Sequence, residues 1–418
     1  MEWAENARFL PNPHSDGAPV EYAAEAALSA AMALVPDIER CVAKGKVPCS
    51  DGSARSDRSI YTGLCGLTIG FLRLGTATRQ QQPLRRAREV ALACVKAELV
   101  QRDSPVSFFC GAPGGIAVAC AASGLLGDDA ERTSLLRQLL DYADAACAHQ
   151  DDELLFGRAG YIYAVLFATR GGAPRAVAAD VDATLRRVAE RIIANGKAMG
   201  AAAKPPWPLL WHCFGEPYLG AAHGTIGVLA MLWRCHHCLP AESRLLVRET
   251  TARLLQIRHA STGNPPIALG DKKDVHVHWC HGSPGLPAMI VAAIEADGDS
   301  ADGALRAAAL RAGEDVWRRG VLLKGNGLCH GLAGNGYAFL SLYRLTGEQV
   351  HLDRARAFAS LLEDARVQGQ MAQHEDPQRR VLGQPDSPGS LMEGSVGVLC
   401  FLLDLAAPEA AAFPGWEL

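Results

Sequence analysis

The chain has 418 residues, of which 49% are apolar and 21% are charged, and it contains no low-complexity tract. This composition predicts one large domain with a continuous hydrophobic core. The 41 basic and 45 acidic residues are mixed evenly and give a formal charge of −4. We therefore expect neither a nucleic-acid partner nor a basic patch that binds a membrane surface.

The cysteines and the start of the chain bear on its compartment. The 13 cysteines are an odd number scattered through apolar runs, which is typical of reduced core thiols rather than of a disulfide framework. The acidic start, Met1–Glu5, has no apolar targeting segment. We expect a cytoplasmic protein, with the nucleus as an alternative location.

The segment 106–127 raises the question of a membrane span, because its 22 residues carry no charge. Five glycines and Pro113 interrupt this segment. We therefore expect a buried core helix of about ten to fourteen residues and no transmembrane segment.

An internal repeat organises the chain. A Gly-x-x-Gly pair followed by an apolar stretch recurs seven times. In chain order the pairs are Gly63/Gly66, Gly111/Gly114, Gly157/Gly160, Gly224/Gly227, Gly282/Gly285, Gly331/Gly334 and Gly394/Gly397. Each interval holds a charged amphipathic helix pattern, and we expect the segment before Gly63 to supply a seventh such helix. The six patterns are Pro83–Leu99, Thr133–His149, Ala176–Gly196, Ala241–His259, Ala304–Leu323 and His351–Val367.

The repeat predicts an all-α fold. The helix after each glycine pair is apolar almost all round and must be buried, whereas its charged partner has one face in water. Stacking seven such pairs into a closed ring buries all seven apolar helices. We predict a single domain, 1–418, with a seven-fold α/α barrel (toroid) of seven inner and seven outer helices. Residues 1–20 are expected to form an N-terminal arm and residues 368–388 a flexible loop.

The repeat register places reactive residues at one end of the ring. The residues just before the first glycines are Thr62, Cys110, Phe156, His223, His281, His330 and Glu393. Two adjacent repeats carry the pairs Cys280-His281 and Cys329-His330, and thiolate with imidazole is a typical zinc ligand set. Four ligands would make a closed structural site and three would leave an open position, and the spacing does not choose between them.

Other readings of these histidines and cysteines remain. A lone His223 in an apolar run is often a core histidine with satisfied hydrogen bonds, and the two Cys-His pairs can be buried by coincidence. The run Cys235–Cys238 resembles a metal knuckle, but it has no second pair nearby, so we expect a solvent-side turn. His276 and His278 are either partners of the metal ligands or merely exposed.

Three runs closely resemble the lanthionine synthetase C-like (LanC-like) proteins. They are Val277–Gly285, Gly220–Gly224 and Gly327–Asn335. The resemblance covers essentially the whole chain, from Arg8–Pro13 to Phe413–Leu418, and is to the eukaryotic branch. It implies a seven-fold α/α barrel with one zinc ion, held by residues that match Cys280, Cys329 and His330. Water would take the fourth position, which is the open form of a catalytic zinc site.

The resemblance also implies an activity. Eukaryotic members bind glutathione and add its thiol to dehydroalanine or dehydrobutyrine residues in proteins or peptides, and bacterial relatives close thioether rings. His223 matches the family motif and is our choice for proton transfer. Glu153 lies four residues before Gly157, where bacterial enzymes carry a functional aspartate, so it would activate the thiol or orient His223. Its alternative role is that of an acidic residue at a helix N-terminus.

Glutathione carries two carboxylates, so its site needs cations. Arg8, Lys324 and Asp386 match family positions in the glutathione site, although Arg8 can also be a mobile surface arginine. The family has an arginine three residues before the matched aspartate, where this chain has Gly383. Arg379 or Arg380 is the available substitute.

Two further functions stay open at this stage. The chain can be a scaffold or signalling protein that holds glutathione or a protein kinase without chemistry, or it can be a cyclase of a small peptide. A receptor-like membrane role is disfavoured by the interrupted apolar segment described above. An open zinc site accompanied by His223 favours an enzyme.

Overall fold

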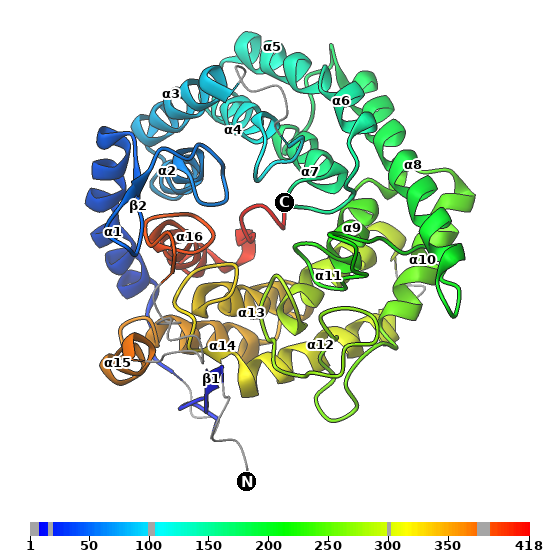
Figure 1. The fold of residues 1–418 in the computed structure, drawn as a ribbon. Coiled ribbons are helices and arrows are strands. Elements are labelled where there is room, and N and C mark those ends of the chain that lie inside the picture. Colours follow the sequence, from blue (N-terminus) through cyan, green and yellow to red (C-terminus); the bar gives the residue numbers. More distant parts are fainter. Residues whose placement is uncertain (1–7, 16–19, 99–104, 299–301, 374–384) are drawn as a thin grey trace.

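The computed structural model describes residues 8–15, 20–98, 105–298, 302–373 and 385–418, and these form two concentric rings of helices (Figure 1). The inner helices are α2 (Leu64–Thr78), α4 (Ala112–Leu125), α7 (Arg158–Ala168), α9 (Thr225–Arg234), α11 (Leu286–Asp297), α13 (Leu332–Thr346) and α16 (Ser395–Leu405). The outer helices are α1 (Ala24–Lys44), α3 (Gln81–Glu98), α5 (Asp129–Leu140), α6 (Ala143–Ala148), α8 (Ala178–Ala202), α10 (Ala241–Leu254), α12 (Asp302–Arg319) and α14 (Gln349–Ser360). Helix α16 packs on α1 and α2, so the ring is closed and the predicted α/α toroid is confirmed.

The glycine pairs begin the inner helices, as the repeat predicts. Six inner helices start directly after the first glycine of a pair, and α11 follows a short 3-10 helix, η2 (Ser283–Gly285). The second glycine lies against the preceding turn. A Cβ atom on Gly334 would lie only 1.8 Å from the carbonyl oxygen of Leu328. Only glycine allows this close approach of two backbone segments.

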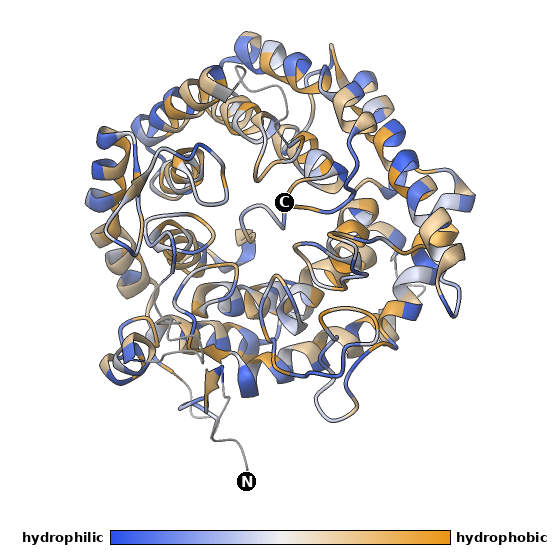
Figure 2. Cartoon of the chain, in the orientation of Figure 1, coloured by the Kyte–Doolittle hydropathy of each residue, from blue (hydrophilic) through white to orange (hydrophobic). Residues whose placement is uncertain are grey.

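Burial separates the two rings. The inner helices bury residues on every side, and α4 carries no charged residue. The outer helix α8 buries one stripe, with Val181, Leu185, Val188 and Ile192 spaced for a single helical face. Figure 2 shows the corresponding colours, with hydrophilic residues along the outside of the ring and hydrophobic residues inside it.

Some predicted boundaries were wrong. The pattern Thr133–His149 forms two helices, α5 and α6, separated by residues 141–142. Residues 368–373, predicted as part of a flexible loop, belong to α15 (Ala365–Gln373). This helix forms because Val367 and Met371 bury one face and Asp364 accepts the backbone N–H groups at its start. Residues 374–384 of the predicted loop lie outside the described part of the chain.

The segments that precede the inner helices, here called the glycine turns, are joined by backbone hydrogen bonds at one end of the ring. The N–H to C=O pairs are Tyr61 to Phe109, Phe108 to Gly160, Leu154 to Ala222, Ala222 to Cys280, Cys280 to Cys329, Cys329 to Met392 and Met392 to Tyr61. The pairs run through all seven repeats and return to the first. This circle brings residues far apart in sequence to one end of the barrel.

The described part of the N-terminal arm and the C-terminal segment are both anchored. The arm strand β1 (Phe9–Leu10) pairs antiparallel with β4 (Val321–Leu322), next to the glycine turn of α13. A second two-stranded sheet joins β2 (Val47–Pro48) and β3 (Ala54–Arg55). The C-terminal segment turns into the middle of the ring, where Glu417 accepts hydrogen bonds from Ser341 and Arg344 at 2.9 and 2.7 Å (Figure 1).

Among the described residues, no helix is both long and apolar enough to cross a bilayer.

Candidate metal centre and catalytic site

Three of the four residues in the two Cys-His pairs converge. The ligand atoms of Cys280, Cys329 and His330 all lie within 4.8 Å of one another. The backbone explains this, because the N–H of Cys280 donates to the carbonyl of Cys329 at 3.3 Å. Both thiols are buried, with residue exposures of 9% and 3%. The set of two sulfurs and one imidazole fits a zinc ion with one open position.

The electrostatics of the two thiols also suit a cation. A hydrogen bond between them lowers the pKa of Cys280, and the same hydrogen bond with burial raises the pKa of Cys329 well above its usual value. Tyr61 lies beside both sulfurs, and burial raises its pKa well above its usual value. Sequence reasoning missed Tyr61, because a tyrosine two residues before a glycine pair carries no recognisable signal.

The fourth residue, His281, lies in another environment. Its ring is 5.5 Å from that of Tyr218 and 6.3 Å from that of His223, between ring centroids. Burial lowers the pKa of His281 to about 4, so the ring is neutral at pH 7. His278 instead approaches the candidate metal ligands, with its Nδ1 3.9 Å from the sulfur of Cys280. The geometry thus favours three ligands, with His278 as a neighbour.

A second cluster adjoins the first. The Nδ1 atom of His223 lies 2.9 Å from Oε2 of Glu153. The carboxylate is buried and accepts the backbone N–H groups of Leu155 and Gly157 at 2.8 and 3.1 Å. Glu153 therefore contacts His223 and also accepts backbone N–H groups at the start of α7. His223 donates through Nδ1 to this acceptor, which leaves Nε2 as its second nitrogen.

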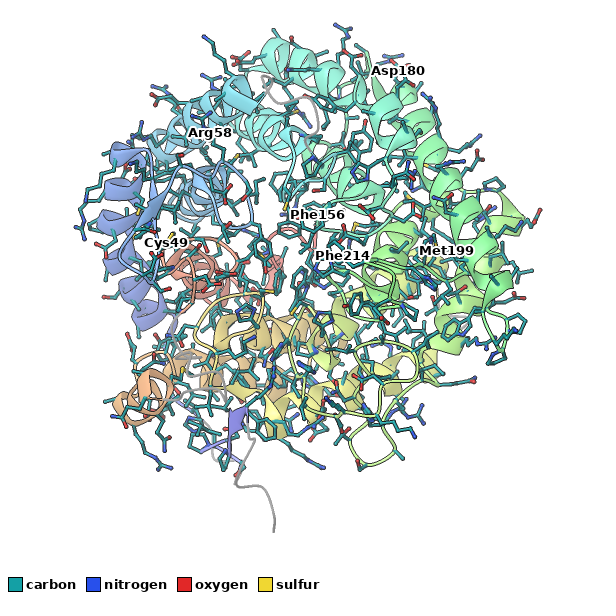
Figure 3. All side chains as sticks on the ribbon, in the orientation of Figure 1. Cys49, Arg58, Phe156, Asp180, Met199 and Phe214 are labelled. Atoms are coloured by element: carbon teal, nitrogen blue, oxygen red, sulfur yellow. The ribbon has the colours of Figure 1, made fainter. Side chains whose placement is uncertain are left out.

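The two clusters belong to one site. The N–H of Ala222, next to His223, donates to the carbonyl of Cys280 at 3.4 Å. An aromatic wall flanks His223, since Phe156 stacks at 5.9 Å and Phe214 lies at 5.6 Å. Phe214 is 72% exposed, and Figure 3 shows it with Phe156 near the middle of the ring.

Cys213 also lies in this cluster and was missed from the sequence. Its sulfur is 3.9 Å from Nδ1 of His223, and a tight turn between Cys213 and Glu216 places it there. Burial and the charge of Glu153 raise the pKa of the Cys213 thiol to about 12. The segment has no hydrophobic periodicity, so its fold could not be read from the sequence.

The predicted glutathione contacts are only partly brought together. The N–H of Leu323 donates to the carbonyl of Arg8 at 2.9 Å, which places Arg8 near Lys324 and anchors it. The Arg8 guanidinium lies 3.2 Å from His276. Burial, followed by the charges of Arg8 and Lys324, lowers the pKa of His276 to about 4.

Asp386 is exposed, and no described hydrogen bond or ion pair joins its carboxylate to Arg8 or Lys324. Its backbone carbonyl accepts from Ser50 at 3.2 Å. Arg379, Arg380 and Gly383 lie outside the described residues.

The prediction that the run Cys235–Cys238 forms a solvent-side turn was wrong for all of its residues except His237. The run ends α9 and forms a 3-10 helix, η1 (His236–Cys238), in which only His237 is exposed. His237 and Cys238 approach Asp182 of α8, with the three ligand atoms within 4.8 Å of one another. Asp182 and His237 are both well exposed to solvent.

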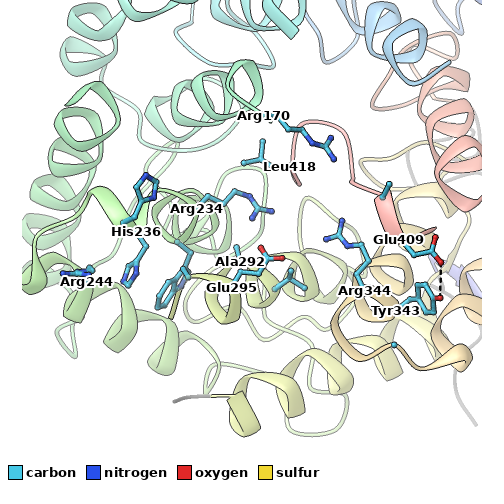
Figure 4. Close-up of a pocket in the computed structure, with 16 residues that line it drawn as sticks. Arg170, Arg234, His236, Arg244, Ala292, Glu295, Tyr343, Arg344, Glu409 and Leu418 are labelled. Carbon is cyan, nitrogen blue, oxygen red and sulfur yellow. Dashed lines mark hydrogen bonds between the residues drawn. The ribbon is translucent and has the colours of Figure 1, made fainter. Parts of the chain in front are cut away.

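A cavity of about 950 Å³ lies near η1, where the inner helices end (Figure 4). Arg170, Arg234 and Arg344 point into it. The glycine turns lie at the start of the inner helices, so this cavity is at the opposite end of the barrel from Cys280 and His223. The candidate metal centre and the cavity are therefore separate features.

Comparisons with known proteins identify the family of the chain. The profile of the family described as "Lanthionine synthetase C-like protein" matches residues 55–418. The chain belongs to this family. It is 32% identical over 365 residues to the glutathione S-transferase LANCL1 of Danio rerio, covering 86% of this chain and 84% of that protein. It is 33% identical over 411 residues to the LanC-like protein GCL1 of Arabidopsis thaliana, covering 94% and 89%.

A solved structure supports the fold of this LanC-like chain. The structure of nisin cyclase superposes with a TM-score of 0.61, covering 91% of this chain and 95% of the cyclase. The two sequences are only 15% identical, so the likeness concerns the fold. The toroid predicted from the glycine register is thus shared with a known LanC-like structure.

Proposed function

We propose that this protein is a zinc-dependent enzyme that forms a carbon–sulfur bond, transferring glutathione to dehydroalanine or dehydrobutyrine residues of proteins or peptides. The observation that carries the proposal is the convergence of Cys280, Cys329 and His330 next to the His223–Glu153 pair. The name of the Danio rerio relative, a glutathione S-transferase, supports the choice of thiol.

The role of Cys280, Cys329 and His330 is to hold the ion that would activate this thiol. Zinc bound by Cys280, Cys329 and His330 would lower the pKa of an incoming thiol, and two sulfur ligands suit a soft nucleophile. Both cysteines are buried, so the protein shields their sulfur atoms from water.

His223 and Glu153 handle the proton. As the sulfur attacks the β-carbon of the dehydroamino acid, the electron pair of the C=C bond moves to the α-carbon, which must take up one proton. Nε2 of His223 is the proposed donor, because Nδ1 is held by Glu153. The buried carboxylate stabilises the imidazolium before the transfer and keeps the ring in one orientation.

Arg8 and Lys324 are the proposed contacts for the carboxylates of glutathione, and Asp386 is proposed as a further contact from the C-terminal side. The pairing of β1 with β4 supports this assignment, because it holds Arg8 beside the segment that leads to Cys329. The alternative of a peptide lanthionine cyclase is favoured only by the name of the superposed nisin cyclase.

The test is to incubate the protein with glutathione and a dehydroalanine peptide and to follow the peptide mass. We expect a gain of one glutathione, lost in Cys329→Ala and kept in Cys120→Ala, which removes a buried thiol from α4. A peptide that also carries its own cysteine separates the two enzymes, since cyclisation leaves the mass unchanged. Metal analysis should find about one zinc per chain, lost in Cys280→Ala. Full activity in Cys329→Ala would refute the proposal.

A further inference from the structure

The His223–Glu153 pair has a third neighbour that the proposed reaction does not use. The sulfur of Cys213, Nδ1 of His223 and a carboxylate oxygen of Glu153 all lie within 4.8 Å of one another. Glu153 comes from the start of α7, His223 from the glycine turn of α9, and Cys213 from the loop before that turn. Glu153 and Cys213 are each 2% exposed, while the side chain of His223 is 20% exposed.

We propose that Glu153, Cys213 and His223 form a second binding site for Zn²⁺, distinct from the Cys280, Cys329 and His330 centre, and that a cation bound there switches off proton transfer by His223. The binding half stands on the geometry of these three side chains. The inhibitory half rests on the proposed function, in which His223 is the proton donor.

The donor types and distances suit a tetrahedral ion. A thiolate, an imidazole and a carboxylate are all zinc ligands, with bonds of about 2.3, 2.0 and 2.1 Å. Such bonds put neighbouring ligand atoms about 3.3 to 3.6 Å apart in a tetrahedron. The observed separations from Nδ1 of His223 are 3.9 Å to the sulfur of Cys213 and 2.9 Å to Oε2 of Glu153. Shifts of about half an ångström bring both of these separations into the tetrahedral range.

The surroundings hold two of the ligands in place. The backbone N–H groups of Leu155 and Gly157 fix the carboxylate of Glu153. The ring of Phe156 stacks on His223 at an interplanar angle of 18°. Binding replaces the hydrogen bond from His223 to Glu153, and one proton leaves the thiol of Cys213 as the sulfur becomes a ligand. Ligands held by such neighbours bind a metal with little reorganisation.

Occupation of this site removes the chemistry that His223 supplies. With Nδ1 on a cation, the remaining ring proton resides on Nε2, and the neutral imidazole has no lone pair free to take up another proton. The ring can no longer alternate between imidazole and imidazolium, which general acid–base catalysis requires. The cation also removes the hydrogen bond through which Glu153 stabilises the imidazolium.

The experiment uses the full chain loaded with one equivalent of zinc, and adds Co²⁺ as the probe. A thiolate bound to Co²⁺ absorbs in the near ultraviolet, so this band reports Cys213 directly and needs no enzymatic activity. We expect one further equivalent to bind with this band. Cys213→Ser should lose the band and bind Co²⁺ at least tenfold more weakly. Cys213→Ala serves as a second variant, with the thermal melt of each variant as a check of folding.

Cys238→Ser is the matched control, because Cys238 belongs to the exposed cluster with Asp182 and His237. It should keep the band and the affinity. Loss of the band in Cys238→Ser but not in Cys213→Ser would overturn the proposal, as would the absence of any further Co²⁺–thiolate band in the wild-type chain.

The inhibitory role is tested by the rate of glutathione adduct formation. The rate of each variant is compared with the rate of the same variant at one equivalent of zinc. Excess Zn²⁺ should slow the wild-type chain at least tenfold, and the concentration needed should rise at least tenfold in Cys213→Ser. Equal inhibition of both chains would refute the inhibitory role. If the chain binds Co²⁺ through Cys213 but forms no glutathione adduct at one equivalent of zinc, the proposed function is refuted and the second metal site still stands.

Discussion

Replacing Glu153 with glutamine tests whether this carboxylate acts on His223 or only caps α7. Glu153→Gln keeps the shape of the side chain and removes its charge. The hydrogen bond from Nδ1 of His223 is 2.9 Å long and its acceptor is buried, and a hydrogen bond to a charged group contributes about 1.5–3 kcal/mol. Because this bond stabilises the imidazolium, we expect kcat to fall about tenfold to 150-fold. Zinc content and KM for glutathione should stay unchanged.

The assay is a single-turnover rate of glutathione adduct formation on a dehydroalanine peptide, followed by mass spectrometry. Asp151→Asn is the matched control, because it removes a charge from the same helix start, and no described hydrogen bond joins its carboxylate to His223. A double-mutant cycle with His223→Gln completes the test. If the two substitutions lower the rate additively, or if Asp151→Asn lowers kcat as much as Glu153→Gln, then Glu153 does not act through His223.

Three further predictions concern the fold, acid stability and glutathione binding. Gly334→Ala should lower the unfolding free energy by about 3 kcal/mol or more, measured by denaturant unfolding, because its Cβ would meet the carbonyl of Leu328. Gly369→Ala, which meets no atom within 4 Å, should be neutral or stabilising, and equal losses in both would contradict the close-approach argument. His276 is neutral in the folded chain because burial lowers its pKa to about 4, so stability should fall as pH drops from about 6.5 toward 4. His276→Gln should flatten that fall by about 2 kcal/mol after allowance for the partly exposed ring, and an unchanged pH profile would show that the pKa of His276 is not lowered in the folded chain. Arg8→Ala should raise KM for glutathione about tenfold to 100-fold with little change in kcat, and an unchanged KM would remove Arg8 from the binding site.

The glycine register made the fold predictable. Each Gly-x-x-Gly pair marks a place where two backbone segments approach closely. This requirement is local, because the two glycines of a pair, such as Gly331 and Gly334, lie only three residues apart in the sequence. The inner helices were equally clear, because a helix that is apolar almost all round must be buried. The boundaries of the outer helices were less clear. The break at residues 141–142 and helix α15 depend on packing against neighbours, which the hydrophobic period alone does not report.

The site was predictable to the extent that it follows the same register. Cys280, His281, Cys329 and His330 were expected together because they stand at equivalent positions of adjacent repeats. The choice of Cys280, Cys329 and His330 among them rested on the resemblance to the LanC-like proteins. Tyr61 was not expected, because a tyrosine two residues before a glycine pair carries no recognisable signal. Cys213 was not expected, because it reaches the site through a turn without a periodic pattern. For the same reason, the anchoring of Arg8 by the pairing of β1 with β4 could not be foreseen.

The sequence by itself determined the seven-fold ring and the end of it at which the metal donors gather, because both follow from short-range patterns repeated along the chain. Only the tertiary structure decided how the side chains at that end are divided. His281, adjacent to Cys280, lies beside His223, whereas Cys213 joins Glu153 and His223 from another loop. Side-chain direction in a turn depends on backbone hydrogen bonds to distant segments, and these exist only once the ring has closed.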